Sequence, residues 1–199
     1  MIENLKPLYN AALDPAAKLF AKTPIHPNAV SFAGVLVSCV ACYDAARGHW
    51  IASALLIALG SCMDGLDGLL ARTAGKVSVF GGVFDSICDR FTEFAWTLGI
   101  LIFYMHNPLC HGLGVYSTFL SMSGSILVSY MRARCEAAGI PCSRGLLQRP
   151  ERIIMLIISF LCGPTIMIGG LLLISVLAYI TVVERIYIAY STGDGAVKH

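Results

Sequence analysis

Long apolar runs separated by short polar segments make up most of the chain, and this pattern predicts membrane-spanning helices. A helix of about 20 residues crosses the hydrocarbon core of a bilayer. Six runs can serve as spans, at about residues 30–46, 51–70, 79–104, 113–136, 149–162 and 166–190. The sequence therefore predicts an all-α, polytopic membrane protein with six transmembrane helices in a single domain, residues 1–199.

Residues 1–24 have a different pattern, in which lysines stand among apolar side chains. Lys18 and Lys22, for example, flank Leu19 and Phe20. Such a segment is typical of an amphipathic helix that lies on the membrane surface, with its basic residues toward anionic headgroups. A flexible tail is the alternative interpretation. Prolines at positions 24 and 27 end the segment in either case.

The composition supports a membrane protein and argues against a nucleic-acid-binding one. Hydrophobic residues make up 57% of the chain and charged residues 13%, whereas soluble proteins carry about 25% charged residues. The formal net charge is only +2, and no stretch interleaves basic with aromatic residues as a nucleic-acid platform does. The expected partners therefore include membrane lipids and exclude nucleic acid.

Four aspartates stand within or beside these apolar runs, where ionisable side chains are costly and usually functional. Asp64 and Asp67 are three positions apart, and Asp85 and Asp89 are four apart, so each pair shares one face of a helix. One pair ends the second run and the other begins the third, which brings both pairs to the same membrane side. Hard divalent cations are the natural partners of such a four-carboxylate site.

The distribution of Lys and Arg predicts the orientation in the membrane. Of the 14 basic residues, only Arg47 falls in a loop on the side opposite the aspartates. Because cytoplasmic loops carry the excess of Lys and Arg, we expect both termini and residues 138–148 in the cytoplasm, and residues 47–50 and 106–112 outside. The protein is thus predicted to be a multi-pass protein of the cell (inner) membrane, with its active site facing the cytoplasm.

The aspartate segment resembles the signature of the CDP-alcohol phosphotransferase family. Every fixed position of that signature is matched by Asp64-x2-Asp67-Gly68-x2-Ala71-Arg72-x8-Gly81-x3-Asp85-x3-Asp89. Members of the family transfer a phosphatidyl-type group from a CDP-linked lipid to an alcohol and release CMP. The resemblance implies that the four aspartates hold Mg²⁺ or Mn²⁺, two ions in all, and that Asp89 also acts as the general base. It further implies a CDP-diacylglycerol-type lipid as substrate and a homodimer.

The same resemblance implies a binding site for the CDP-lipid. Gly68, Ala71 and Arg72 match motif positions that line the diphosphate, and Gly65 and Gly68 leave space through which a substrate could approach. Upstream, the segment H-P-N-A-V-S at residues 26–31 resembles the family's L-T-P-N-x-V-T. The predicted CDP-lipid contacts are Asn28, Ser31, Gly68, Ala71, Arg72 and Gly81. For Asn28, an N-cap of the first span is the alternative.

A second basic group lies outside the signature. Residues 129–140, S-Y-M-R-A-R-C-E-A-A-G-I, and residues 149–154, R-P-E-R-I-I, resemble the prokaryotic phosphatidylinositol-phosphate synthases, a narrower group within the family. That resemblance implies that Arg132, Arg152 and Arg185 hold the phosphate of inositol 1-phosphate. The chain departs from the narrower group at Arg132, where a Lys is usual.

Several alternatives to this function stay open at the level of sequence. The acceptor could instead be glycerol 3-phosphate, as in a phosphatidylglycerophosphate synthase, or the chain could be another CDP-alcohol phosphotransferase. Each arginine could also be ordinary positive charge at a helix end. A cation transporter is the remote alternative, since carboxylates can line an ion path, but transporter sites lie near the midplane rather than near one surface.

Overall fold

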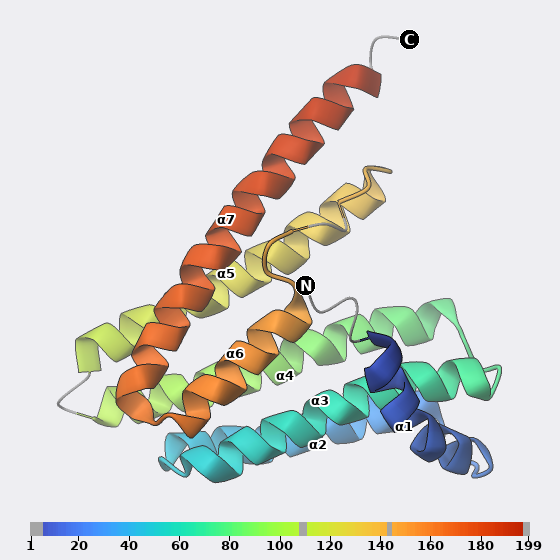
Figure 1. The fold of residues 1–199 in the computed structure, drawn as a ribbon, viewed down its shortest axis with the longest axis horizontal. Coiled ribbons are helices and arrows are strands. Elements are labelled where there is room, and N and C mark those ends of the chain that lie inside the picture. The colour runs from blue at the N-terminus through green and yellow to red at the C-terminus, as the bar shows by residue number, and fades with distance from the viewer. Residues whose placement is uncertain (1–5, 108–110, 143–144, 197–199) are drawn as a thin grey trace. The chain divides into compact units, whose positions relative to one another are not determined.

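The computed structural model describes residues 6–107, 111–142 and 145–196, and every regular element within these ranges is an α helix (Figure 1). The helices begin and end within a few residues of the predicted runs. They are α1 Lys6–Ala21, α2 Pro27–Ala46, α3 Trp50–Thr73, α4 Val79–His106, α5 His111–Ala137, α6 Arg149–Leu161 and α7 Pro164–Ala196. The chain forms two compact units, unit 1 at Met1–Phe103 and unit 2 at Tyr104–His199.

Unit 1 is built on an antiparallel pair formed by α2 and α3, with α1 packed on α3. Pro27 opens α2, and the His26 side chain accepts a hydrogen bond from the backbone N–H of Asn28. The N-cap is therefore His26, so the alternative role considered for Asn28 is wrong. The helix of the predicted surface segment is present as α1, and residues 1–5 of that segment lie outside the described residues.

Helix α4 up to Phe103 completes unit 1. One residue fixes where this helix starts, and another lets it pack closely on α2. Ser78 stands just before α4, where its hydroxyl accepts a hydrogen bond from the backbone N–H of Gly81, 3.0 Å away, as an N-cap does. Farther along, α4 comes so near α2 that a methyl group on Gly99 would overlap the carbonyl oxygen of Cys42. Small residues permit such close approaches between helices in membranes.

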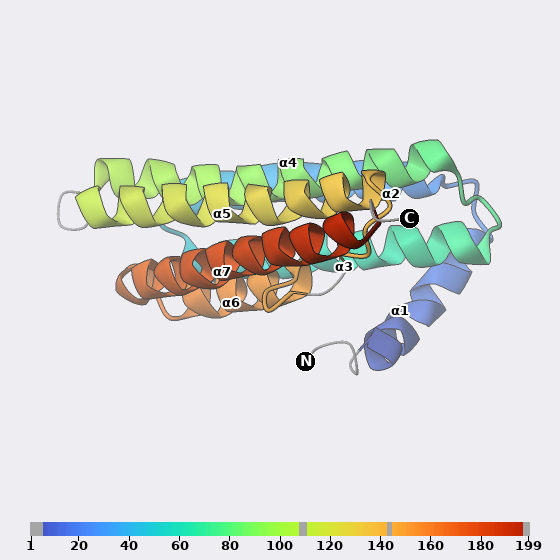
Figure 2. The same cartoon turned by 90° about the horizontal axis from the view of Figure 1, so that it is seen from above.

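Unit 2 consists mainly of α5, α6 and α7, which Figure 2 shows running beside one another. Gly163 adopts a positive φ of 88°, which favours glycine, and it makes the turn that Pro164 follows at the start of α7. The Tyr104 hydroxyl donates to the carbonyl of Pro164. Small residues again mark the helix contacts, since a methyl on Gly124 of α5 would lie 3.0 Å from Ala178 of α7.

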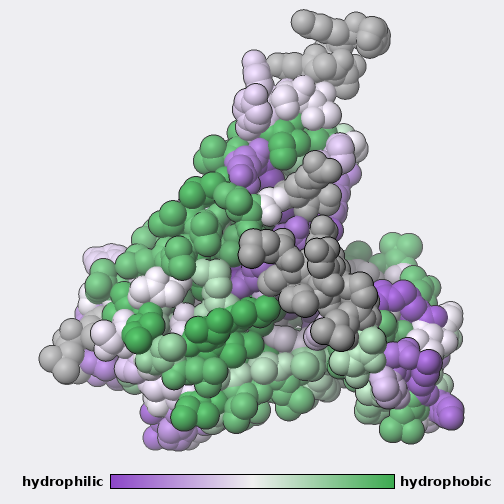
Figure 3. All heavy atoms as spheres, in the orientation of Figure 1, coloured by the Kyte–Doolittle hydropathy of each residue, from purple (hydrophilic) through white to green (hydrophobic). Residues whose placement is uncertain are grey.

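Several helices expose large apolar side chains along one stripe. On α2, Phe32, Leu36 and Val40 follow one another at four-residue spacing and are all more than half exposed. Ile51, Leu55 and Leu59 repeat this spacing on α3. Apolar residues likewise cover the face of α7 and α6 in view in Figure 3. Surfaces of this kind are unfavourable in water and suit contact with lipid.

Four helices of the described residues are long and apolar enough to cross a membrane: α2, α3, α5 and residues Pro164–Thr192 of α7. The two other predicted spans differ in an instructive way. Helix α4 is long enough, but Asp85, Asp89, Arg90 and Glu93 stand between its start and its middle turn. Helix α6 has 13 residues, or roughly 20 Å at 1.5 Å per residue, which is short of a bilayer core.

The close approach of α2 and α4 gives a prediction about stability. We expect Gly99→Ala to lower the thermal unfolding midpoint of the detergent-solubilised protein. The added methyl would also lie 2.9 Å from the Ala45 side chain, and overpacking of this kind costs about 1–3 kcal/mol. Gly169→Ala on α7 is the matched control, because its methyl would meet open space. Equal midpoints for the two variants would contradict the packing argument.

Candidate functional site

Three of the four predicted metal ligands come together in unit 1. Asp64 on α3 and Asp85 and Asp89 on α4 each offer a carboxylate oxygen, and these oxygens lie within 4.8 Å of one another. All three residues are half-buried. Opposite oxygen ligands of one ion stand about 4.2 Å apart for Mg²⁺ and roughly 5 Å apart for Ca²⁺. The donor set and its spacing therefore fit a divalent cation.

The fourth aspartate is buried beside this group. Asp67 is only 4% exposed. Its carboxylate is close enough to Asp64 and Asp85 for their charges to act on it. Its Oδ2 accepts a hydrogen bond from the hydroxyl of Ser31 on α2. Ser31 thus fixes the direction of a carboxylate in the acidic group, a role that sequence reasoning did not assign to it. Its predicted contact with the CDP-lipid stays a prediction.

The other predicted CDP-lipid contacts are found in neighbouring pairs. A methyl on Gly68 would lie 3.7 and 3.8 Å from the two terminal nitrogens of Arg72. A methyl on Gly81 would lie 3.5 Å from Oδ1 of Asn28, so the start of α2 reaches the start of α4. Arg72 is exposed and Ala71 is half-buried. The exposed guanidinium group of Arg72 can donate two hydrogen bonds to a phosphate.

Tyr9 is a residue that sequence reasoning missed at this site. Its hydroxyl donates to the backbone carbonyl of Ser61, 3.0 Å away, and its ring fills the space beside Gly65. The sequence interpretation had left that space for a substrate. The signal available in the sequence was weak, since one tyrosine in an amphipathic segment does not reveal which helix it contacts.

The three predicted acceptor arginines lie in unit 2. Arg152 on α6 is 4% exposed and Arg185 on α7 is 2% exposed. The charges of both Arg132 and Arg152 act on Arg185, so the three groups form one electrostatic cluster. Arg132, on α5, is exposed, and its Nε donates to Oε1 of Glu136 at 2.8 Å.

Backbone contacts from two directions hold Arg185 in place. A terminal nitrogen of its guanidinium group donates to the backbone carbonyl of Val128 on α5. The Cys142 thiol donates to the backbone carbonyl of Arg185 at 3.9 Å. Burial, together with the neighbouring Cys135 thiol, raises the pKa of Cys142 to about 11. The thiol is therefore protonated at neutral pH and can act as this donor.

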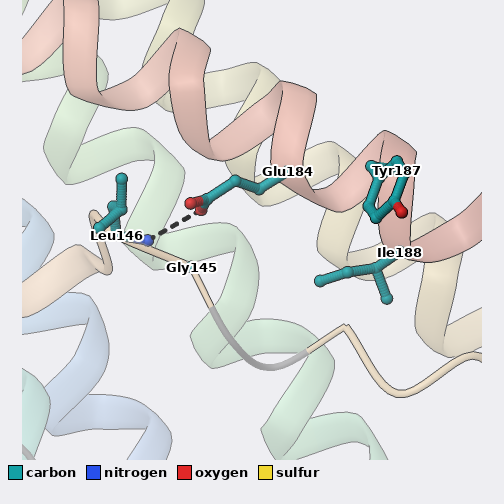
Figure 4. Close-up of a pocket in the computed structure, with 5 residues that line it drawn as sticks. All are labelled: Gly145, Leu146, Glu184, Tyr187 and Ile188. Carbon is teal, nitrogen blue, oxygen red and sulfur yellow. Dashed lines mark hydrogen bonds between the residues drawn. The ribbon is translucent and has the colours of Figure 1, made fainter.

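The segment before α6 is fixed along α7 near Arg185. The backbone N–H of Leu147 donates to the hydroxyl of Thr181 at 3.1 Å, and the N–H of Leu146 donates to Oε2 of Glu184 at 3.3 Å. Figure 4 shows the second of these bonds at one edge of a pocket of about 350 Å³. The pocket is lined by Gly145, Leu146, Glu184, Tyr187 and Ile188.

Comparisons of sequence agree with the signature. The family model for CDP-alcohol phosphatidyltransferases matches residues 24–187. The archaetidylinositol phosphate synthase of Pyrococcus horikoshii is 35% identical over 189 residues, which cover 94% of this chain and 95% of that protein. The phosphatidylinositol phosphate synthase of Corynebacterium glutamicum is 33% identical over 149 residues, or 74% of this chain and 68% of that protein.

Solved structures give the same result. The crystal structure of Mycobacterium tuberculosis phosphatidylinositol phosphate synthase with CDP-DAG bound matches with a TM-score of 0.82 at 28% identity, over 89% of this chain and 93% of that chain. The same enzyme in complex with manganese and citrate matches with a TM-score of 0.83 at 27% identity, over 89% and 88%. Since the family model spans most of the residues and a relative at 35% identity covers 94% of the chain, the chain is an enzyme that belongs to the CDP-alcohol phosphatidyltransferase family.

Proposed function

We propose that this enzyme transfers the phosphatidyl-type group of a CDP-linked lipid to inositol 1-phosphate and releases CMP. The observation that carries the choice of acceptor is the burial of two arginines, Arg152 and Arg185, in one cluster. Relatives named for inositol-phosphate products, at 35% and 33% identity, support the same choice. Their names differ in the lipid, archaetidyl or phosphatidyl, so the proposal covers CDP-linked lipids of either type.

Electrostatics explains why the arginine cluster favours a phosphorylated acceptor. Removing a guanidinium group from water is costly, and a second buried cation nearby adds repulsion. A dianionic phosphate offsets both costs, because each planar guanidinium group can donate two parallel hydrogen bonds to its oxygens. Arg132 is exposed and already paired with Glu136, so we propose that it contributes mainly long-range attraction.

The acidic cluster serves the other substrate. We propose that Asp64, Asp67, Asp85 and Asp89 hold two divalent cations, Mg²⁺ or Mn²⁺. Such ions, when bound, would neutralise the diphosphate and polarise its oxygens. Arg72 donates hydrogen bonds to the diphosphate, and Asn28, Ser31, Gly68, Ala71 and Gly81 line the CDP-lipid site. A relative solved with manganese supports a metal-dependent site.

Asp89 is proposed as the group that takes the acceptor's proton. The hydroxyl oxygen of inositol 1-phosphate forms a bond to the lipid-linked phosphorus, the bond from that phosphorus to the CMP oxygen breaks, and CMP departs. The hydroxyl proton passes to the Asp89 carboxylate. A carboxylate that also binds a cation is a weak base, so Asp89 acts by its position close to a proton that the attack itself makes acidic.

We further propose that the chain crosses the cell (inner) membrane six times, with α4 and α6 as the remaining spans. Because α6 alone is short of a bilayer core, it would cross together with the segment before it, which is bonded along α7. The site would face the cytoplasm, and α1 would lie on the membrane surface. The family model runs from residue 24 to residue 187 across both units, which supports one functional domain. A homodimer is proposed on the family resemblance alone.

The acceptor proposal predicts a specific split in kinetic constants. Arg152→Ala and Arg185→Ala should each raise the KM for inositol 1-phosphate by about 10- to 150-fold, because each variant loses a hydrogen bond to a charged group. The KM for the CDP-lipid should change much less. Arg152→Lys should recover part of the loss. CMP release from CDP-diacylglycerol measures both constants, and Arg134→Ala, an exposed neighbour of the cluster, is the control.

The same assay should be run on the parent enzyme with four acceptors: inositol 1-phosphate, glycerol 3-phosphate, inositol and serine. We expect transfer to inositol 1-phosphate and poor transfer to inositol, which lacks the phosphate. Preference for glycerol 3-phosphate would replace the proposed acceptor. Higher KM values for the CDP-lipid alone in both arginine variants would show that the arginines were assigned to the wrong substrate.

The metal site predicts losses of graded size. Loss of a residue that hydrogen-bonds to a metal ligand typically weakens metal binding ~10- to 100-fold. We expect a larger loss of Mn²⁺ affinity when a proposed ligand itself is replaced, as in Asp64→Asn, Asp85→Asn and Asp89→Asn. Ser31→Ala should fall within that range, because it removes the hydrogen bond to Asp67. Mn²⁺ titration followed by electron paramagnetic resonance measures this. Asp44→Asn, whose carboxylate pairs with His49, is the control; unchanged affinity in Asp85→Asn would refute the metal assignment.

The orientation predicts the accessibility of two positions. In a variant without its eight native cysteines, an impermeant maleimide should label a cysteine introduced at His106 in intact cells. A cysteine introduced at Ala138 should react only after the membrane is opened. Both native residues are exposed, so burial does not limit the reaction. Labelling of position 138 from outside would reverse the proposed orientation.

A further inference from the structure

Helix α1 contacts α3 at the turn that carries a metal ligand. The Tyr9 hydroxyl donates to the backbone carbonyl of Ser61 at 3.0 Å. In an α helix that carbonyl also accepts the N–H of the residue four positions later, which here is Gly65. Tyr9 therefore bonds to the backbone of the turn from Ser61 to Gly65, and Asp64 lies within this turn.

The contact depends on the missing side chain at position 65. A methyl on Gly65 would overlap the Tyr9 hydroxyl and would lie 2.6 Å from Cε1 and 2.9 Å from Cζ of the ring. At Gly68, three residues later on the same helix, a methyl would be 3.7 Å from its nearest neighbour. The Tyr9 ring thus occupies a notch that exists only because residue 65 is a glycine.

A glycine inside a helix has a cost that this contact explains. Glycine disfavours a helix relative to alanine by about 1 kcal/mol and leaves the backbone of its turn easier to distort. A metal ligand on such a turn would be poorly fixed unless another group held the turn. The Tyr9 phenol donates a hydrogen bond to the backbone carbonyl of Ser61. Its rigid ring packs against Gly65, the residue directly after Asp64.

We propose that Tyr9 is a positioning residue for the metal site: α1, docked through the notch at Gly65, holds the Ser61–Gly65 turn so that the Asp64 carboxylate keeps its place among the ligands. The inference rests on the metal binding of the proposed function and deepens it. It gives α1 a task in the chemistry beyond lying on a membrane. Preorganised ligands bind more tightly because less ordering remains to be done on binding.

The test is a cycle of variants of the full-length purified enzyme. Tyr9→Ala and Gly65→Ala should each weaken Mn²⁺ binding, measured without substrate, by about 10-fold or more. Tyr9→Phe keeps the ring and loses one neutral hydrogen bond, so a loss of about 2- to 12-fold is expected. The double variant Tyr9→Ala/Gly65→Ala should be no weaker than either single variant, because the alanine methyl then has no ring to displace.

A second measurement follows the docking of α1 without any metal. Lys18 of α1 is exposed, so trypsin can cleave after it once the helix loosens. Cleavage of the metal-free protein should be faster in Tyr9→Ala and in Gly65→Ala than in the parent. Ser61→Ala, which keeps the backbone carbonyl, and Gly82→Ala, whose methyl meets open space, are matched controls that should leave both measurements unchanged.

Two results would overturn the proposal. Losses of Tyr9→Ala and Gly65→Ala that multiply in the double variant would mean that the two residues act separately and that the ring does not need the space at Gly65. Unchanged Mn²⁺ affinity in Tyr9→Ala would mean that the contact does not position Asp64. Failure of the proposed acceptor would instead appear in the parent enzyme, as absent transfer to inositol 1-phosphate, and would leave these Mn²⁺ affinities as they are.

Discussion

Repulsion between carboxylates in a poorly hydrated place is the constraint on which the arrangement of unit 1 depends. Asp64, Asp85 and Asp89 present oxygens within 4.8 Å of one another, and charges interact more strongly where water is excluded. Such a group keeps its geometry only if the surrounding elements hold each carboxylate. Two of those supports come from outside the helices that carry the aspartates: Ser31 of α2 bonds to Asp67, and Tyr9 of α1 bonds to the turn around Asp64. All four helices of unit 1 thus contribute to one site.

In unit 2 the charges that must be held in place are positive, and contacts from neighbouring elements again hold them. The buried charges of its described residues are those of Arg152 and Arg185, and the contacts of Arg185 show how one of them is held. Arg185 donates to the Val128 carbonyl while its own carbonyl accepts from Cys142. The segment before α6 is bonded to Thr181 and Glu184 on the same helix. The guanidinium group is therefore fixed by elements adjacent to it in space that are far away in sequence.

The sequence was sufficient to predict the helix positions and the grouping of the aspartates, because those depend on local signals, whereas the arginine group was implied by the family resemblance. Apolar runs predicted the helices, although α2 and α7 begin at Pro27 and Pro164, slightly before the predicted starts at residues 30 and 166. Aspartates three or four positions apart must share a helix face. It was insufficient wherever a contact joins distant segments. Pro27 at the first helical position is a local sign that His26 is the N-cap, but no spacing rule connects Ser31 to Asp67 or Tyr9 to Gly65. The grouping of the aspartates was thus predictable, whereas the residues that support them were not.

The close packing of α2 against α3 and α4 stabilises the helices without the help of a metal ion. The backbones meet where side chains are smallest, at Gly99 against Cys42 and at Gly60, where a methyl would lie 3.4 Å from the Ser38 hydroxyl. These contacts involve no charged group, although Gly60 is only one helical turn before Asp64. Helix association in unit 1 therefore has its own source of stability. A cation at the acidic end would then bind to helices that are already assembled, as a reagent of an enzyme does, and the fold of unit 1 would not require it.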